Sequence, residues 1–435
     1  MLRTQSAPRT LASQLPHVTP GETVTVQGWV HRRRSLAAVT FLILRDRSGL
    51  TQVVVKAPET VAQVAALGEE TVVSVTATLV ANGAAPGGVE LVDPVVVPLT
   101  EPAHTPPVEL WRPTLAAGLP TLLDHAPVTL RHPRRKAAWQ IASASMQGFR
   151  RALTTDGFTE IQTPKLVGTS TESGANVFTV DYFGKPAYLA QSPQLYKQTL
   201  VGVFERVFEV GPVFRAEPHD TVRHIAEYVS LDAELGFIED HRDVLAVLRG
   251  ALAGMVSAVE ELAADAVSLL DVRLPVVPEE IPVIHFSEAL RLVGAPEDEP
   301  DLAPAHERAL SAWAVEEHGS ELLAVEGYPM RKRPFYTHPQ PDDPQWSNSF
   351  DLLFRGLELT SGGQRLHRYT EYQAALAASG QSEEPYDGYL QAFRHGMPPH
   401  GGFAIGLERW VARLTGAENI REARLFPRDL NRLTP

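Results

Sequence analysis

Residues 208–237, FEVGPVFRAEPHDTVRHIAEYVSLDAELGF, combine a core pattern with a high density of charge. Alternating apolar residues around Phe208 and Val213 predict strands that pack into a core. Ionisable side chains interrupt the same strands at Arg215, Glu217, His224, Asp232 and Glu234. Burying several charges is costly unless they face a charged ligand, so the segment predicts a sheet that lines a binding cleft. A surface hairpin with exposed ion pairs is the alternative interpretation.

Two later segments have the same character. In residues 348–369, NSFDLLFRGLELTSGGQRLHRY, a strand pattern carries Glu358 and reaches a predicted tight turn at Ser361. A carboxylate beside a hydroxyl suits Mg²⁺, which prefers oxygen ligands. Residues 401–416, GGFAIGLERWVARLTG, predict a glycine-rich strand that runs into a helix. Because strands and helices do not alternate regularly in this part of the chain, we expect an antiparallel α+β domain.

The N-terminal part of the chain has a different pattern. Five short β-rich runs between residues 21 and 100 are separated by turn residues, which predicts a small barrel of the OB-fold type. Proline-rich sequence follows and cannot form a long helix or a central strand. We therefore expect a barrel at residues 1–104, a linker at 105–133 and the α+β domain at 134–435.

Composition and charge limit the function further. The 435 residues are 44% hydrophobic and 21% charged, as in an ordinary soluble protein. The chain has no cysteine, which excludes disulfides and thiolate zinc sites. A net charge of −13 argues against indiscriminate binding of nucleic acid, although residues 1–58 are basic. No stretch is typical of a signal peptide or a membrane span, so we expect a cytoplasmic protein with no membrane partner.

Three segments, in their order along the chain, resemble the signature motifs of class II aminoacyl-tRNA synthetases. Residues 157–166, GFTEIQTPKL, resemble motif 1, residues 214–217, FRAE, resemble motif 2, and residues 402–409, GFAIGLER, resemble motif 3. The barrel, with GWVHRRR and FLILRD, resembles the anticodon-binding OB domain of the aspartyl, asparaginyl and lysyl subgroup. The resemblance implies that the chain activates L-aspartate with ATP and transfers it to tRNA(Asp).

The resemblance also implies a role for each matched position of the ATP site. Arg215 and Arg409 would be the catalytic residues: Arg215 would bridge the amino-acid carboxylate and the α-phosphate, and Arg409 would lie against adenine and the γ-phosphate. Glu217 would accept a hydrogen bond from the adenine amino group. Glu358 and Ser361 would hold Mg²⁺, with Ser361 as a simple turn residue the alternative. The further ATP contacts are expected at Arg223, His224, Ile225, Gly406, Leu407 and Glu408.

Lys197 and Arg365 determine which amino acid is expected. Both match the aspartate-binding pair of aspartyl enzymes, whereas lysyl enzymes place a glutamate in the segment that holds Lys197, and asparaginyl enzymes lack the lysine. Taken alone, Lys197 would more often be a solvated helix lysine. Asp232 would contact the substrate ammonium group, and Glu172 resembles a residue of the mobile loop that closes over the amino acid. The expected aspartate site also includes Gln194 and Ser361.

In the barrel, Phe41 and Gln52 match positions where an aromatic ring stacks on an anticodon base and an amide reads a base edge. Phe41 as plain barrel core is the competing interpretation. Either Arg33 or Arg34 could contact the same RNA loop, and the spacing does not decide between them.

His31 and Pro86 bear on the choice of tRNA. The interval between motifs 2 and 3 is too short for the extra domain of typical bacterial aspartyl enzymes, so the chain resembles the compact archaeal type. Within that type, His31 and Pro86 resemble the relaxed form, which also charges tRNA(Asn). That form implies an amidotransferase that converts the misacylated product. Motif 1 implies a homodimer.

Other functions remain open at this point. A discriminating aspartyl enzyme and an asparaginyl enzyme are the alternatives within the class. A noncatalytic RNA-binding protein and an ammonia-dependent asparagine synthetase are the alternatives outside it; the charged residues disfavour the first, and the N-terminal barrel disfavours the second.

Overall fold

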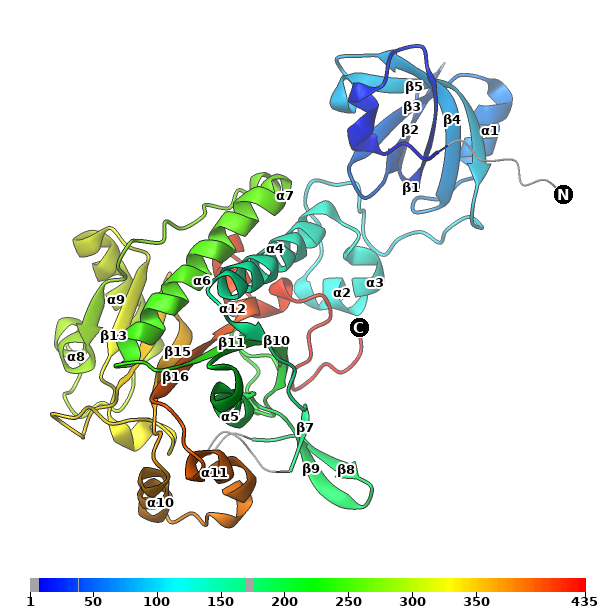
Figure 1. Ribbon diagram of the computed structural model, residues 1–435. Helices are drawn as coiled ribbons and strands as arrows, with labels where there is room; N and C mark the ends of the chain where they lie inside the picture. The colour runs from blue at the N-terminus through cyan, green and yellow to red at the C-terminus, as the bar shows by residue number, and fades with distance from the viewer. Residues whose placement is uncertain (1–7, 38, 169–175) are drawn as a thin grey trace. The chain divides into compact units, whose positions relative to one another are not determined.

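The computed structural model, drawn in Figure 1, describes residues 8–37, 39–168 and 176–435. The chain divides into two compact units, Met1–His132 and Pro133–Pro435. The predicted linker contains two short helices, α2 (Leu119–Asp124) and α3 (Ala126–Thr129), and all but its last residue belongs to the first unit. No helix in the described ranges is long and apolar enough to cross a membrane.

The first unit is built on a closed barrel of five strands in the order β1-β2-β3-β5-β4. Alternate side chains, such as Leu42 and Leu44, point inward and form the buried core. The five-stranded barrel predicted from the sequence is therefore confirmed. Its elements are β1 (Thr23–Ser35), β2 (Thr40–Arg45), β3 (Leu50–Val55), α1 (Pro58–Ala65), β4 (Val72–Ala81) and β5 (Val89–Pro98).

An eight-stranded sheet forms the centre of the second unit, in the order β12-β13-β14-β15-β16-β11-β10-β6. Neighbouring strands are antiparallel except for β12 with β13 and β6 with β10, which are parallel pairs at the two edges. The expected antiparallel α+β domain is thus confirmed, with parallel pairs only at its margins. The strands are β6 (Thr159–Glu160), β10 (Arg206–Phe214), β11 (Glu227–Gly236), β12 (Val283–His285), β13 (Leu322–Glu326), β14 (Ser349–Phe354), β15 (Leu357–Arg365) and β16 (His400–Gly406).

Helices α4 (Pro133–Thr155), α6 (His241–Leu262) and α12 (Leu407–Thr415) run across one face of this sheet, as Figure 1 shows. The helical sequence after α6 is interrupted at Ala263, and α7 (Ala264–Leu270) begins after it. The remaining elements are β7 (Leu166–Val167), β8 (Thr179–Tyr182), β9 (Lys185–Leu189), α5 (Gln194–Phe204), α8 (Phe286–Val293), α9 (Pro304–His318), α10 (Tyr369–Ala378) and α11 (Asp387–Arg394).

Strand β11 explains how one segment serves both a core and a site. Leu231, Ala233 and Leu235 are buried in the hydrophobic cluster beneath the helices. Because side chains alternate between the two faces of a strand, Asp232 and Glu234 lie on the opposite face. A cleft on that face leaves the core beneath the helices undisturbed.

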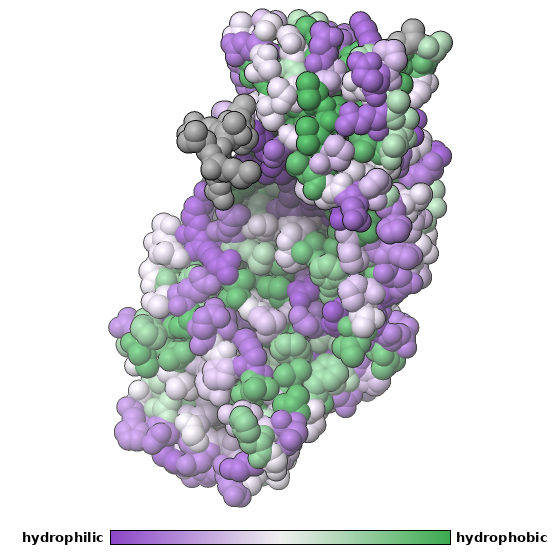
Figure 2. Space-filling view, turned by 90° about the vertical axis from the view of Figure 1, so that its right-hand side faces the viewer, coloured by the Kyte–Doolittle hydropathy of each residue, from purple (hydrophilic) through white to green (hydrophobic). Residues whose placement is uncertain are grey.

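One face of the surface is mixed in polarity. On the face seen in Figure 2, hydrophilic and hydrophobic residues are interspersed, and no broad apolar area dominates the coloured atoms. Single exposed apolar residues are normal on a water-facing surface.

Candidate active site

A cavity of about 460 Å³ lies on the face of the sheet opposite α4 and α6. Leu407 is not on its lining, because its side chain is fully buried in the core. Glu172 lies outside the described residues. The predicted residues on the lining are Gln194, Lys197, Arg215, Glu217, Arg223, His224, Ile225, Asp232, Glu358, Ser361, Arg365, Gly406, Glu408 and Arg409.

One end of the cavity is built around a buried lysine. Lys197 is 1% exposed, and its Nζ lies 3.1 Å from Asp232 Oδ1 and 3.1 Å from Glu234 Oε2. Arg365 Nε lies 3.0 Å from the other oxygen of Glu234, Oε1. Two cations and two carboxylates therefore meet where almost none of their surface is exposed to solvent. The interpretation of Lys197 as a solvated helix lysine is wrong.

Gly402 leaves free the space that the Glu234 carboxylate occupies. Strand β16 lies between β11 and β15, and Gly402 is the cross-strand partner of both Glu234 and Gly363. A Cβ atom on Gly402 would lie 2.0 Å from Glu234 Oε2, so any larger residue would displace the carboxylate. The Gly402 carbonyl also accepts a hydrogen bond of 2.9 Å from Arg365 Nη2. Glycine is thus required at this position of β16, because a side chain of the neighbouring strand β11 occupies the space.

The Glu234 carboxylate stays charged although it is fully buried. Burial alone would raise its pKa, but Arg365 and Lys197 outweigh that effect and hold the pKa below the usual range. His400, opposite Arg365 on β16, is also fully buried. Burial lowers the pKa of His400 to about 4, so the imidazole is neutral near pH 7.

A buried amide donor also lines this end of the cavity. Gln194, at the first position of α5, is 5% exposed, and its Nε2 has no hydrogen-bond partner among the described residues. A buried donor without a partner is unfavourable, and a bound ligand that accepts its hydrogen bond relieves the cost. Gln194 therefore suits a carboxylate or carbonyl oxygen.

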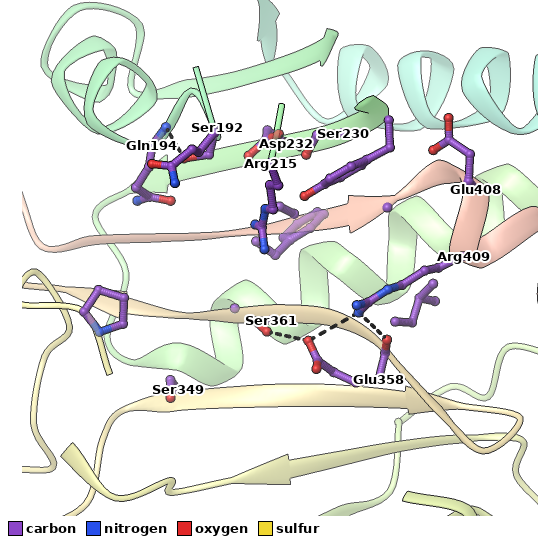
Figure 3. A pocket seen from close by; sticks show the side chains of 18 of the residues that line it. Ser192, Gln194, Arg215, Ser230, Asp232, Ser349, Glu358, Ser361, Glu408 and Arg409 are labelled. Carbon is purple, nitrogen blue, oxygen red and sulfur yellow. Dashed lines mark hydrogen bonds and ion pairs between the residues drawn. The ribbon is translucent and has the colours of Figure 1, made fainter. Parts of the chain in front are cut away.

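Arginines line the middle and the other end of the cavity: in Figure 3, Arg215 lies near Asp232 and Arg409 lies beside Glu358. The Arg215 guanidinium lies 5.7 Å from the ring centroid of Tyr228, which fixes its direction. Arg409 donates a hydrogen bond of 3.0 Å to the Glu358 backbone carbonyl and lies 3.8 Å from Glu358 Oε1. Two guanidinium groups in one cavity suit an anionic ligand with several phosphates.

The Glu408 side chain makes contacts that hold α12 in place. In Figure 3 its side chain points away from Arg409 and Glu358. Its carboxylate accepts hydrogen bonds from the Val229 backbone nitrogen and, at 2.7 Å, from Arg424 Nη1. These contacts join α12 to β11, so a structural role accounts for the Glu408 side chain. An ATP contact by Glu408 stays a prediction.

Ser361 lies in the middle of strand β15, so the predicted tight turn at this position is wrong. The glycines that suggested a turn have a packing reason instead. A Cβ atom would lie 2.5 Å from Phe350 Cζ at Gly362 and 2.6 Å from the Ser349 side chain at Gly363. The strand geometry aims the Ser361 hydroxyl at Glu358, to which it donates a hydrogen bond of 3.1 Å. These two hard oxygen donors fit Mg²⁺.

Sequence reasoning assigned no role to several residues in or beside the site. Glu234 was named among the charges of the cleft-lining strands but was given no function, although it lies two residues after Asp232 on the same strand face. Glu307, on helix α9, lies beside the site: it accepts a hydrogen bond from the Glu358 backbone nitrogen and lies 3.6 Å from Arg223. Arg333, which pairs with a buried carboxylate at 3.1 Å, comes from a loop without any sequence signal.

The barrel residues separate into exposed and structural positions. Phe41 is half-buried and absent from the hydrophobic core, so the interpretation of Phe41 as plain core is wrong. Arg34 is its cross-strand partner and is exposed on the same face. Arg33 points elsewhere: its Nη1 donates to the carbonyls of Val64, Ala65 and Leu67 at 2.8, 2.7 and 2.9 Å. Arg33 thus caps the C-terminal end of α1, and Arg34 is the arginine beside Phe41.

Gln52 is held in a fixed orientation. Its Nε2 donates a hydrogen bond of 2.8 Å to Glu90, which also accepts from Asn82. The side-chain oxygen of Gln52 is therefore the atom suited to accept from a base edge. Pro86 is exposed in a short 3-10 turn between β4 and β5.

His31 does not lie on the open surface. It is 7% exposed, and its Nδ1 lies 3.1 Å from Arg45 Nη1. Arg45 in turn makes a two-pronged ion pair with Glu70, with both N–O distances at 2.8 Å. Burial, with Arg45 adding to it, lowers the pKa of His31 to about 4. His31 can therefore affect RNA binding only indirectly, through the residues that cover it.

The combination of an antiparallel sheet, an arginine-lined cavity and an OB barrel defines a class II aminoacyl-tRNA synthetase. Residues 119–430 match the family of class II tRNA synthetases (D, K and N), and residues 24–99 match the OB-fold nucleic acid binding domain. The chain belongs to this synthetase family and is an aminoacyl-tRNA ligase. The resemblance noted in the sequence is confirmed.

Two relatives and one solved structure show which members of the family this chain is similar to. The aspartate–tRNA(Asp/Asn) ligase of Thermus thermophilus is 46% identical, with 95% of this chain and 97% of that protein covered. The aspartate–tRNA(Asp/Asn) ligase of Deinococcus radiodurans is 45% identical, with 98% and 99% covered. Among solved structures, the asparaginyl-tRNA synthetase of Pyrococcus horikoshii with asparaginyl-adenylate has a TM-score of 0.90 at 30% identity, and covers 98% of this chain and 100% of its own.

Proposed function

We propose that the chain activates L-aspartate with ATP and transfers it to both tRNA(Asp) and tRNA(Asn). The observation that carries the choice of amino acid is the buried pair of cations, Lys197 and Arg365, at one end of the cavity. A cation that cannot reach water favours a carboxylate substrate over its neutral amide analogue. The high identity to two aspartate–tRNA(Asp/Asn) ligases supports the same proposal.

The reaction begins with in-line attack of the aspartate α-carboxylate on the α-phosphate of ATP. Pyrophosphate leaves, and aspartyl-adenylate forms. No protein nucleophile is needed, so the residues act by holding two anions in line and by stabilising the added negative charge. Arg215 lies between the two ends of the cavity, and we assign it to bridge the carboxylate and the α-phosphate. Asp232 receives the substrate ammonium group.

The nucleotide is held at the other end. Glu217 accepts from the adenine amino group, and Arg409 neutralises the triphosphate. Glu358 and Ser361 offer two oxygen ligands for Mg²⁺, which when bound would reduce the charge of the phosphates. Arg223 and His224 would complete the phosphate contacts. The 3′-terminal ribose hydroxyl of the tRNA then attacks the carbonyl carbon of the adenylate, so that the aminoacyl ester forms and AMP leaves.

The asparaginyl enzyme is the strongest rival, because a solved asparaginyl-tRNA synthetase has the same fold. Pyrophosphate exchange measured with each amino acid separates the two: aspartate-dependent exchange is expected, and exchange that depends only on asparagine would contradict the proposal. Charging of the two purified tRNAs then tests the tRNA specificity. A preference of more than about tenfold for tRNA(Asp) would make the enzyme a discriminating one.

Three further expectations depend on this function. Charging of tRNA(Asn) with aspartate requires an amidotransferase that converts the product to asparaginyl-tRNA. Motif 1 supports a homodimer with twofold symmetry, which light scattering tests. A cytoplasmic location is proposed because tRNA charging serves translation.

A further inference from the structure

A cluster of three metal-ligating side chains lies at the edge of the nucleotide end of the cavity. Glu217, His219 and His224 each offer a ligand atom, and these atoms lie within 4.8 Å of one another. His219 was not assigned any role in the reaction. We propose that these three side chains form a binding site for Zn²⁺ or a similar transition-metal ion, separate from the Mg²⁺ site at Glu358 and Ser361.

The distances fit a tetrahedral ion. Zinc bonds of about 2.1 Å to nitrogen and oxygen place tetrahedral ligands about 3.4 Å apart. Glu217 Oε2 lies 3.6 Å from His219 Nδ1 and 4.0 Å from His224 Nε2. The His219–His224 separation is at most 4.8 Å, so rotation of the exposed His219 side chain, with a smaller shift of His224, would bring three protein ligands onto one ion and leave the fourth position open to water.

A hydrogen bond sets the orientation of one imidazole. His224 Nδ1 lies 2.7 Å from the Thr221 hydroxyl oxygen, and this contact turns Nε2 toward Glu217. Partners of this kind fix the tautomer and direction of metal-binding histidines. His219 is more than half exposed, with 56% of its side chain accessible, so an ion can reach the site from solvent.

The loop that carries both histidines is anchored by the C-terminal segment. Arg421 donates to Asp220 Oδ1 at 2.8 Å and to the Thr221 carbonyl at 3.1 Å. The Ile420 backbone nitrogen donates to the Val222 carbonyl at 2.9 Å. The residues between His219 and His224 are thus held in place before any ligand arrives, which lowers the entropy cost of binding an ion.

Local charge permits a cation at this position. Arg223 and Arg409 are the nearest positive groups, but each has a carboxylate partner, Glu307 at 3.6 Å and Glu358 at 3.8 Å. Glu217 supplies a negative ligand. Two imidazoles with one carboxylate select zinc and its neighbours over Mg²⁺, which prefers oxygen alone.

Zinc at this site would slow adenylate formation. This consequence rests on the proposed function, in which Glu217 accepts from adenine and His224 touches the phosphates. An ion held by both side chains redirects them from the nucleotide.

Cobalt serves as the spectroscopic probe of the site. Tag-free, chelator-treated protein is titrated with Co²⁺ in excess Mg²⁺, and the visible absorption of tetrahedral cobalt is recorded. We expect one tightly bound Co²⁺ per chain that Zn²⁺ displaces. His219→Ala should weaken binding by at least about tenfold, and His219→Asp should restore it, because its carboxylate oxygen lies as many bonds from the backbone as Nδ1.

His395→Ala is the matched control, since His395 is exposed in the same unit and belongs to no metal-ligating cluster among the described residues. Absence of the cobalt spectrum in the wild type, an unchanged His219→Ala variant, or equal weakening by His395→Ala would overturn the proposal. Zinc should also inhibit pyrophosphate exchange by the wild type more than by His219→Ala. If exchange is absent altogether, the proposed function fails, whereas the cobalt spectrum still decides the metal site.

Discussion

Comparing Lys197→Met with Lys165→Met should separate aspartate recognition from stability. Methionine has a similar volume, so the change mainly removes a charge. In the wild type, Lys197 lies 3.1 Å from both Asp232 and Glu234, and all three side chains are at most 2% exposed. The variant leaves two buried carboxylates without one of their two cations.

The magnitude follows from Coulomb's law. At a separation of about 4 Å and an effective dielectric constant of about 20, one charge pair contributes about 4 kcal/mol. Since about 1.4 kcal/mol corresponds to tenfold in affinity, loss of the Lys197 charge should raise the KM for aspartate by up to about 1000-fold. Protonation of one carboxylate in the variant would reduce the effect, so we expect a rise between about 100-fold and 1000-fold.

Pyrophosphate exchange measured over a range of aspartate concentrations gives this KM, and urea unfolding gives the stability. Lys197→Met should lower the free energy of unfolding by about 3 to 5 kcal/mol, because it breaks a buried pair. Lys165→Met is the matched control. Lys165 lies 2.8 Å from the buried Glu209 but does not line the cavity, so it should lose stability while keeping the KM for aspartate. If both variants raise KM equally, or if Lys197→Met changes it by less than about tenfold, the reasoning is refuted.

Three other perturbations test separate parts of the molecule. Arg33→Ala should destabilise the barrel by about 1 to 3 kcal/mol in urea, since it removes bonds to three carbonyls, whereas Arg34→Ala should leave stability unchanged and weaken tRNA binding in a filter assay. The pKa of His400 is lowered from 6.5 to about 4, so the unfolded chain binds a proton at a higher pH than the folded chain does. The free energy of unfolding therefore falls as the pH drops through this range, by about 2 kcal/mol at a pH of about 5. His400→Gln should abolish this loss. Glu358→Gln should raise the Mg²⁺ concentration required for half-maximal exchange, and an unchanged requirement would exclude Glu358 as a ligand.

The fold was predictable because its periodic patterns are strong. Alternation around Phe208 and Leu231 specifies strands with one core face, and the short β-rich runs before residue 100 specify a barrel. Charges on the polar face of those strands then locate the cleft. Local sequence is enough for both inferences, since each depends on residues within one or two strands.

Contacts between distant segments were not predictable in the same way. The sequence SGG at residues 361–363 suggested a turn, but glycine also occurs where a neighbouring strand presses close, as Phe350 and Ser349 do here. Arg33 and Arg34 are adjacent in sequence and both basic, and only the position of α1 decides which of them is bound internally. Glu307 approaches the site from helix α9, and nothing in the sequence of that helix indicates its contact with Glu358.

The arrangement of charge at the aspartate end explains how a site for an anion can exist before its ligand arrives. Two unpaired buried cations would each cost several kcal/mol. Glu234 avoids this cost because its two oxygens meet Lys197 and Arg365 separately, at 3.1 and 3.0 Å. With Asp232 included, the four side chains sum to zero charge. A bound aspartate side chain therefore interacts with cations whose charge Asp232 and Glu234 already balance. Selection against asparagine depends on the positions of these four side chains, which Gly402 permits, as well as on the attraction between opposite charges.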